Sequence, residues 1–196
     1  MKKAIIALAA LAISSSAFAG AKWTYVDAGY VMGDSGDEST DGYSIRGSFG
    51  FAEIWHIGAS WGAVDYFGGN GKTNGSDSDA YSIYFGVNPA LTDDIDLVVD
   101  LGYTAAEDEV GTEKLDSDSI FLRSGPRMMI GDNFELHTYV SLGWGNQDQS
   151  GGGDTDSTDV AVEIGGAYYF NPAWSIGADV AVQDDNLSTL YVRWSF

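Results

Sequence analysis

The feature that most constrains the fold of this chain is a repeated alternation of apolar and polar residues. Successive side chains of a β-strand point to opposite faces, so alternation with a period of two predicts strands with one apolar and one polar face. The last block is the most regular, and its apolar face carries Ser188, Leu190, Val192, Trp194 and Phe196. The opposite face of that block carries Thr189, Tyr191, Arg193 and Ser195. The pattern therefore predicts an all-β fold.

Blocks of this kind recur along the chain and are separated by clusters of Gly, Asp, Ser and Asn. They cover 23–32, 42–52, 54–65, 80–88, 95–103, 117–130, 134–144, 159–170, 174–183 and 188–196. A tilted strand that crosses a hydrocarbon layer needs about 9–11 residues, and most of these blocks approach that length. The blocks therefore predict ten strands, with eight as the alternative if the first block and one other are not strands.

The connections between blocks alternate between short and long. Short ones lie at 52–53, 88–94, 131–133 and 171–173, and long acidic ones at 33–41, 66–79, 105–116 and 146–157. A last connection at 184–186 is also short. Bacterial outer-membrane barrels have short periplasmic turns, longer outer loops and an even number of strands. We predict an antiparallel up-and-down transmembrane β-barrel.

The distribution of aromatic residues favours lipid over water as the surroundings of this barrel. At the periplasmic ends of the apolar faces we place Trp55, Phe134, Phe170, Trp174, Trp194 and Phe196. At the outer ends we place Tyr43, Trp61, Tyr81, Tyr103 and Trp144. Two aromatic belts around a band of Leu, Ile and Val are typical of a membrane-spanning surface, whereas a soluble barrel turns its apolar residues inward.

The first residues have the composition of an export signal. Two lysines, Lys2 and Lys3, precede an apolar run from Ala4 to Ile13, and a small-x-small sequence ends at Ala19. This arrangement predicts a cleaved signal peptide over 1–19, because the apolar run is too short to span a bilayer as a helix. We expect residues 20–196 to form the barrel, exported to the outer membrane.

The acidity and lack of cysteine exclude several functions. The net charge is −20 and the chain has no cysteine. Phosphate repulsion argues against nucleic acid as a partner, and thiol chemistry is impossible. The acidic connections contain Asp34, Asp37, Glu38, Asp41, Asp77, Asp79, Asp116, Asp118, Asp154, Asp156 and Asp159. These could bind Ca²⁺ or Mg²⁺ weakly, but no complete calcium-loop pattern is present, and a solvated acidic surface is the preferred interpretation.

Several segments together resemble a known family. They are Tyr25–Tyr30, Gly42–Ser48, Asn171–Trp174 and Tyr191–Phe196. They are similar to small proteobacterial outer-membrane barrels, described as porin-like, OmpA-like or diffusible-signal-regulated surface proteins. The resemblance implies the fold and the location but no catalytic residues. The alternating strand Leu190, Val192, Trp194 and Phe196 resembles the C-terminal signal read by the outer-membrane assembly machinery.

Charged residues on the polar faces are the candidate functional residues. The predicted registers place in the lumen Asp27, Arg46, Asp96, Asp100, Arg123, Arg127, Glu135, Asp159, Glu163, Asp179 and Arg193. Buried charges must be paired, so an ion-paired plug that closes the barrel is the first interpretation. The alternative is a narrow channel that prefers cations, because acidic residues are in excess.

An enzymatic site is not predicted. The two histidines, His56 and His137, lie near the periplasmic ends of their strands, where we interpret them as hydrogen-bonding residues of the lumen. The glycine-rich segments 68–72 and 151–153 lack the spacing of a phosphate-binding loop. We therefore predict no catalytic residues, no cofactor and no metal ligands. The expected partners are outer-membrane lipid, lipopolysaccharide and the assembly machinery, and the expected state is a monomer.

Overall fold

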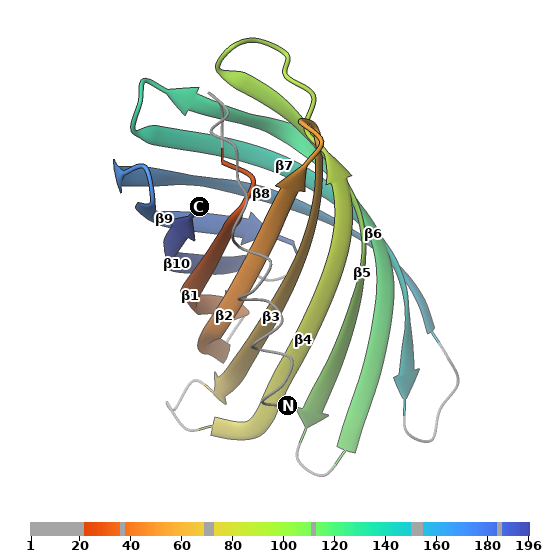
Figure 1. The fold of residues 1–196 in the computed structure, drawn as a ribbon. Helices are drawn as coiled ribbons and strands as arrows, with labels where there is room; N and C mark the ends of the chain where they lie inside the picture. Colours follow the sequence, from red (N-terminus) through yellow and green to blue (C-terminus); the bar gives the residue numbers. More distant parts are fainter. Residues whose placement is uncertain (1–21, 36–37, 69–72, 111–112, 150–154, 184–185) are drawn as a thin grey trace, which may run out of the picture.

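The computed structural model describes residues 22–35, 38–68, 73–110, 113–149, 155–183 and 186–196. These residues form ten strands, joined edge to edge in one sheet (Figure 1). The strands are β1 (Tyr25–Ser35), β2 (Glu38–Phe51), β3 (Trp55–Gly68), β4 (Thr73–Val87), β5 (Ile95–Val110), β6 (Glu113–Ile130), β7 (Phe134–Gln149), β8 (Thr155–Asn171), β9 (Trp174–Val182) and β10 (Asn186–Ser195).

The sheet closes on itself because the first and last strands pair. Each strand is antiparallel to its neighbour, and β1 pairs with β10 from Tyr25 opposite Ser195 to Asp34 opposite Asn186. Closure leaves no strand edge unpaired. Unpaired edges are not tolerated in hydrocarbon, because no water is present to hydrogen-bond their backbone groups. The prediction of ten strands is confirmed, and the alternative of eight is wrong. No described helix is long and apolar enough to cross a membrane.

Short turns join the strands at one end, which we call the turn end. Between β2 and β3 the chain reverses through Ala52 and Glu53, whose φ angles are 48° and 69°. Between β6 and β7, Gly131 has a φ of 62°. These positive φ values lie in the left-handed region, which allows a reversal within a few residues. The strand bounds confirm the predicted short connections at 52–53, 88–94, 131–133 and 171–173, although β8 extends to Asn171.

The opposite end, which we call the loop end, differs from the prediction of long acidic loops. Most residues of the predicted loops 66–79, 105–116 and 146–157 belong to β3 through β8. The apolar pattern stops there, but the backbone pairing continues, as between Asp77 and Glu109. Strand pairing does not need apolar side chains, whereas a prediction from alternation ends each strand where its apolar side chains end. Asp37 and Asp154 lie outside the described residues.

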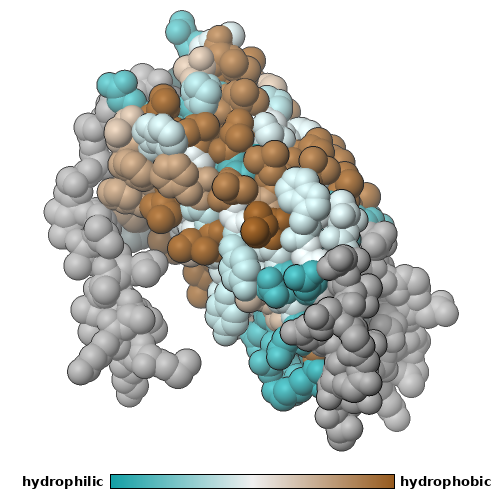
Figure 2. All heavy atoms as spheres, turned by 90° about the vertical axis from the view of Figure 1, so that its right-hand side faces the viewer, coloured by the Kyte–Doolittle hydropathy of each residue, from teal (hydrophilic) through white to brown (hydrophobic). Residues whose placement is uncertain are grey.

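The outer surface of the barrel is apolar around its middle. Ile45, Ile83, Leu101, Leu190 and Val192 all point outward and are about half exposed. Figure 2 shows this hydrophobic surface over the side of the barrel, with hydrophilic residues gathered toward the lower end. The buried residues, in contrast, are mainly polar or charged. This inside-out distribution is that of a barrel whose outer face contacts lipid.

The aromatic belts are arranged as predicted. Trp55, Phe134, Phe170, Trp174 and Trp194 are exposed near the turn end. Tyr43, Tyr81, Tyr103 and Trp144 are exposed further toward the loop end. Trp61 is half-buried, and its Nε1 donates a hydrogen bond of 3.2 Å to Asp79 Oδ1. Aromatic rings at two levels suit the two interfaces of a bilayer.

Candidate functional site

The inward faces of the strands build a charge network near the turn end of the lumen. Strand alternation turns Asp27 of β1, Arg46 of β2 and Arg193 of β10 inward, and the register places Asp27 directly opposite both arginines. Arg46 Nε lies 3.1 Å from Asp27 Oδ1, and Arg193 Nη2 lies 3.2 Å from Asp27 Oδ2. Asp27 is only 2% exposed, so the two guanidinium groups replace water as its partners.

Both arginines also reach strands that do not neighbour their own. Arg46 Nη2 lies 2.7 Å from Asp179 Oδ2 on β9, although β1 and β10 separate β2 from β9 in the sheet. Arg193 Nη1 lies 3.1 Å from Glu135 Oε1 on β7, past β9 and β8. These ion pairs therefore cross the interior of the barrel and do not merely run along its wall.

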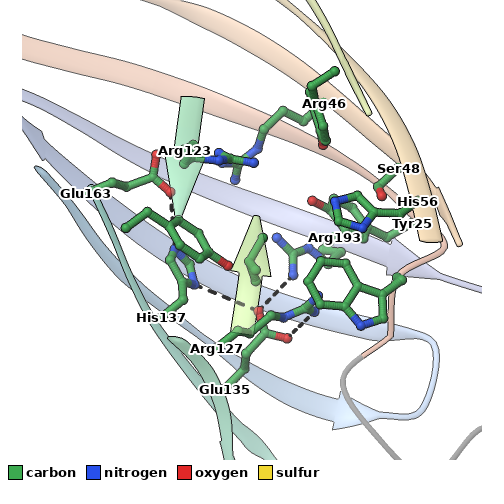
Figure 3. Close-up of a pocket in the computed structure, with 14 residues that line it drawn as sticks. Tyr25, Arg46, Ser48, His56, Arg123, Arg127, Glu135, His137, Glu163 and Arg193 are labelled. Atoms are coloured by element: carbon green, nitrogen blue, oxygen red, sulfur yellow. Dashed lines mark hydrogen bonds and ion pairs between the residues drawn. The ribbon is translucent and has the colours of Figure 1, made fainter. Parts of the chain in front are cut away.

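Glu135 is the centre of the network (Figure 3). In addition to Arg193, its Oε2 accepts hydrogen bonds from Arg127 Nη2 at 2.6 Å and from the Tyr169 hydroxyl at 2.8 Å. Arg127 also donates to the backbone carbonyl of Lys22, which precedes β1. Glu135 and Arg127 are buried, at 1% and 3% exposure. Charge-assisted hydrogen bonds of this length are the arrangement in which buried charges are tolerated.

A second group of charged residues lies on β3, β5 and β6. Asp100 Oδ2 accepts hydrogen bonds from Arg123 Nε and Nη2 at 2.9 and 2.6 Å. His56 Nε2 lies 2.7 Å from Asp100 Oδ1, and His56 Nδ1 lies 3.1 Å from Asn88 Oδ1. The position of His56 in the lumen is thus that of a bridging residue between Asp100 and the turn after β4.

Aromatic side chains fill the space between these charges, a feature that the sequence analysis did not predict. The guanidinium of Arg193 lies 4.0 Å from the ring centre of Tyr25, and that of Arg127 lies 4.3 Å from Trp23. Arg123 similarly lies 4.9 Å from the ring centre of Tyr139. Cations over aromatic faces gain electrostatic stabilisation. The tyrosines on the polar faces of the predicted strands are the signal in the sequence from which these contacts could be predicted.

Glycines on neighbouring strands make room for these rings. A Cβ on Gly58 would lie 2.1 Å from Tyr84 Cζ, and one on Gly177 would lie 2.3 Å from Tyr191 Cζ. Both distances are shorter than any real contact, so each ring occupies the place of the missing side chain. Which inward glycine faces which inward tyrosine depends on the strand register, so the sequence alone does not show these pairs.

The remaining predicted lumen residues occupy different places. Asp96 lies opposite Arg127 in the register of β5 and β6. Glu163 Oε1 lies 3.4 Å from His137 Nε2, which in turn lies 3.3 Å from Asp179, the partner of Arg46. Asp159 is nearer the loop end of β8, where it accepts a 3.3 Å hydrogen bond from Ser157 Oγ. It lies four residues beyond Glu163 along the strand and is therefore not part of the central network.

The C-terminal residues that we assigned to an assembly signal lie on the outer face of β10. Leu190, Val192 and Trp194 are exposed there. The Phe196 ring packs against Trp194 with 4.6 Å between ring centres, and its backbone N–H donates to Thr24 O at 3.1 Å. The last residue thus extends the pairing of β10 with β1 to Thr24, the residue that precedes β1.

The network leaves little free space between its own side chains. The cavity among Arg46, Arg123, Arg127, Glu135, His137 and Arg193 has a volume of about 30 Å³. A water molecule needs at least about 10–15 Å³ of such space, so the cavity holds roughly two. Chemically, this arrangement places ionised side chains across the lumen at this level of the barrel.

Comparison with known proteins identifies the fold. No family model matches the chain, and no curated protein matches it. The β-domain of the Bordetella autotransporter BrkA aligns with a TM-score of 0.50 at 12% identity, covering 88% of this chain and 98% of that one. The NanC porin gives 0.49 at 10% identity, covering 87% and 100%. The KdgM porin gives 0.42 at 11%, covering 88% and 99%. The closed ten-strand sheet and its likeness to the BrkA β-domain show the fold of an outer-membrane β-barrel.

Proposed function

We propose that this protein is a monomeric outer-membrane barrel with a structural or surface-contact role, whose lumen is closed by ion-paired side chains. The ion pair between Arg193 and Glu135, formed across the lumen at 3.1 Å, carries the proposal. Removing one member would leave the other charge buried with one partner fewer, and a buried charge left with no partner costs about 3–5 kcal/mol.

The shape of the interior supports the same function. Small barrels of about eight strands have an interior just wide enough for side chains to fill it, and ten strands enclose only slightly more. Here guanidinium groups and tyrosine rings fill the space within the charge network, where the cavity between them is about 30 Å³. The barrel is thus a rigid membrane anchor, and its outer end is the part available for contact with other molecules.

Planar bilayers test this proposal directly. We expect the purified wild-type protein to give no steady conductance steps. A variant with Asp27, Arg46, Glu135 and Arg193 all replaced by Ala removes both lumen-crossing pairs without leaving Asp27 or Glu135 buried and unpaired, and it should conduct. Steady, cation-selective steps from the wild type would refute the plug and favour the alternative.

That alternative is a narrow channel that prefers cations. It is favoured by the excess of carboxylates over guanidinium groups among the inward residues described above. Carboxylates such as Asp96 and Asp159 lie opposite or beyond the arginines and would attract cations. A reversal potential in a salt gradient distinguishes cation preference from a nonspecific leak.

The surroundings of the barrel follow from its surface. Lipid would contact the outward band of Ile45, Leu101 and Leu190, and lipopolysaccharide would contact the outer leaflet end. The assembly machinery would bind the last strand through its outward residues ending at Phe196. Fractionation tests the location, because the protein should follow outer membranes and should show heat-modifiable migration on gels. Neither a catalytic role nor a nucleic-acid partner is proposed.

A further inference from the structure

Three side chains that line the lumen converge on one point beside the ion-pair network. They come from three consecutive strands: His137 of β7, Glu163 of β8 and Asp179 of β9. His137 Nε2 lies 3.4 Å from Glu163 Oε1 and 3.3 Å from Asp179 Oδ1. All three atoms are buried, and among the described residues none of them has a partner of hydrogen-bonding geometry. Figure 3 shows His137 and Glu163 pointing toward each other.

The separations match those of ligands around a small metal ion. Zinc lies about 2.0–2.2 Å from nitrogen and oxygen ligands, and in tetrahedral geometry this places the ligand atoms roughly 3.3–3.6 Å apart. The two measured separations from His137 Nε2 fall at this distance. A neutral imidazole nitrogen offers one lone pair, and each carboxylate offers one oxygen, so the three atoms provide three of four tetrahedral positions.

The strand register places a glycine between two of the three ligands, His137 and Asp179. Gly165 of β8 lies directly opposite His137 on one side and Asp179 on the other. A Cβ on Gly165 would lie 2.2 Å from Asp179 Oδ1 and 2.6 Å from His137 Nε2. The space in front of the ligands therefore exists because residue 165 has no side chain.

Neighbouring groups fix the orientation of the ligands. Arg46 Nη2 holds the other Asp179 oxygen, Oδ2, at 2.7 Å, so that Oδ1 is turned toward His137. The His137 ring stacks on Tyr139 with 4.9 Å between centres, and its Nδ1 faces Glu135 Oε1 at 3.9 Å. Groups that orient a ligand from behind in this way are typical of metal sites and raise affinity.

We propose that His137, Glu163 and Asp179 bind a transition-metal dication, with zinc as the ion that their geometry fits best, and that a water occupies the fourth position. An imidazole nitrogen disfavours Ca²⁺ and Mg²⁺, which take oxygen ligands. His137 and Glu163 also line the 30 Å³ cavity, so the site borders the free space within the network. The ion would join β7, β8 and β9 inside the barrel. The proposal does not depend on whether the lumen conducts.

Metal content of the purified protein tests the site. The full-length barrel, folded in detergent and stripped with a chelator, is loaded with Zn²⁺, separated from free metal by gel filtration and analysed by elemental mass spectrometry. We expect about one zinc per chain for the wild type. Loss of a direct ligand should weaken binding at least as much as loss of an orienting group, about 10–100-fold. E163Q and H137Q should therefore lose most of the retained zinc.

Asp159→Asn is the matched control, because it makes the same carboxylate-to-amide change four residues away on the same inward face. It should retain zinc as the wild type does. Co²⁺ provides a second measurement on the wild type, since its tetrahedral complexes absorb visible light and added Zn²⁺ should abolish that absorption. The proposal is overturned if the wild type retains no more zinc than E163Q, if D159N loses zinc equally, or if Co²⁺ gives no tetrahedral spectrum.

Discussion

Arg193 and Glu135 lie on β10 and β7, two strands that do not touch in the sheet, and their side chains meet inside the barrel at 3.1 Å. Each has further partners, Asp27 for Arg193 and Arg127 for Glu135. The pair thus connects two sides of the charge network.

Breaking this pair from one side should destabilise the barrel. We expect Arg193→Met to lower the free energy of unfolding, by less than the roughly 3–5 kcal/mol of a fully unpaired buried charge, because Glu135 and Asp27 each remain buried with one guanidinium fewer. Urea unfolding in detergent or lipid measures the change. Combining R193M with E135Q should cost less than the sum of the single variants, since residues in contact are not additive. Strict additivity would show that the two side chains are not coupled.

Filling the space opposite Tyr191 should also destabilise the barrel. In Gly177→Ala, the new methyl group would lie 2.3 Å from Tyr191 Cζ, so the ring or the strand must move. Overpacking of this kind costs about 1–3 kcal/mol. Gly143→Ala is the control, because its Cβ meets nothing closer than 3.8 Å. Thermal unfolding followed by heat-modifiable gel migration compares them, and equal loss in both variants would contradict the packing described here.

The apolar outer face should be sensitive to charge in a depth-dependent way. Leu190 is 53% exposed on the outer face near the middle of β10, and Ser188 lies on the same face one step closer to the loop end. Arg at the bilayer midplane costs about 2–4 kcal/mol, falling to about 0–1 kcal/mol near an interface. Leu190→Arg should therefore impair folding into lipid vesicles more than Ser188→Arg. Equal effects would argue against lipid contact at Leu190.

The last residue gives a prediction about assembly. Because Phe196 contributes only one packed ring and one backbone hydrogen bond at the turn end, Phe196→Ala should refold in detergent almost as well as the wild type. If the assembly machinery reads this residue, the same variant should reach the outer membrane of cells in reduced amounts. Leu187→Ala on β10 serves as a control for a general loss of strand stability. Normal levels of F196A in the outer membrane would exclude that role.

The fold was accessible from sequence because the alternation of side chains is a local property of each strand. Leu190, Val192 and Trp194 identify the outer face of β10 without knowledge of any other strand. The same reasoning was wrong about the strand ends at the loop side. Strands such as β5 and β6 continue into acidic sequence through pairing with each other, and hydrophobicity carries no information about that pairing.

The inward direction of Arg46, Arg193 and Glu135 was therefore determined by the sequence, and their partners were not. Which carboxylate each guanidinium meets depends on the register of every strand between them and on the closure of β1 against β10. The convergence of His137, Glu163 and Asp179 likewise appears only when three strands are set side by side around Gly165. Alternation fixes the face of a residue, whereas distances across a lumen arise from the closed sheet as a whole.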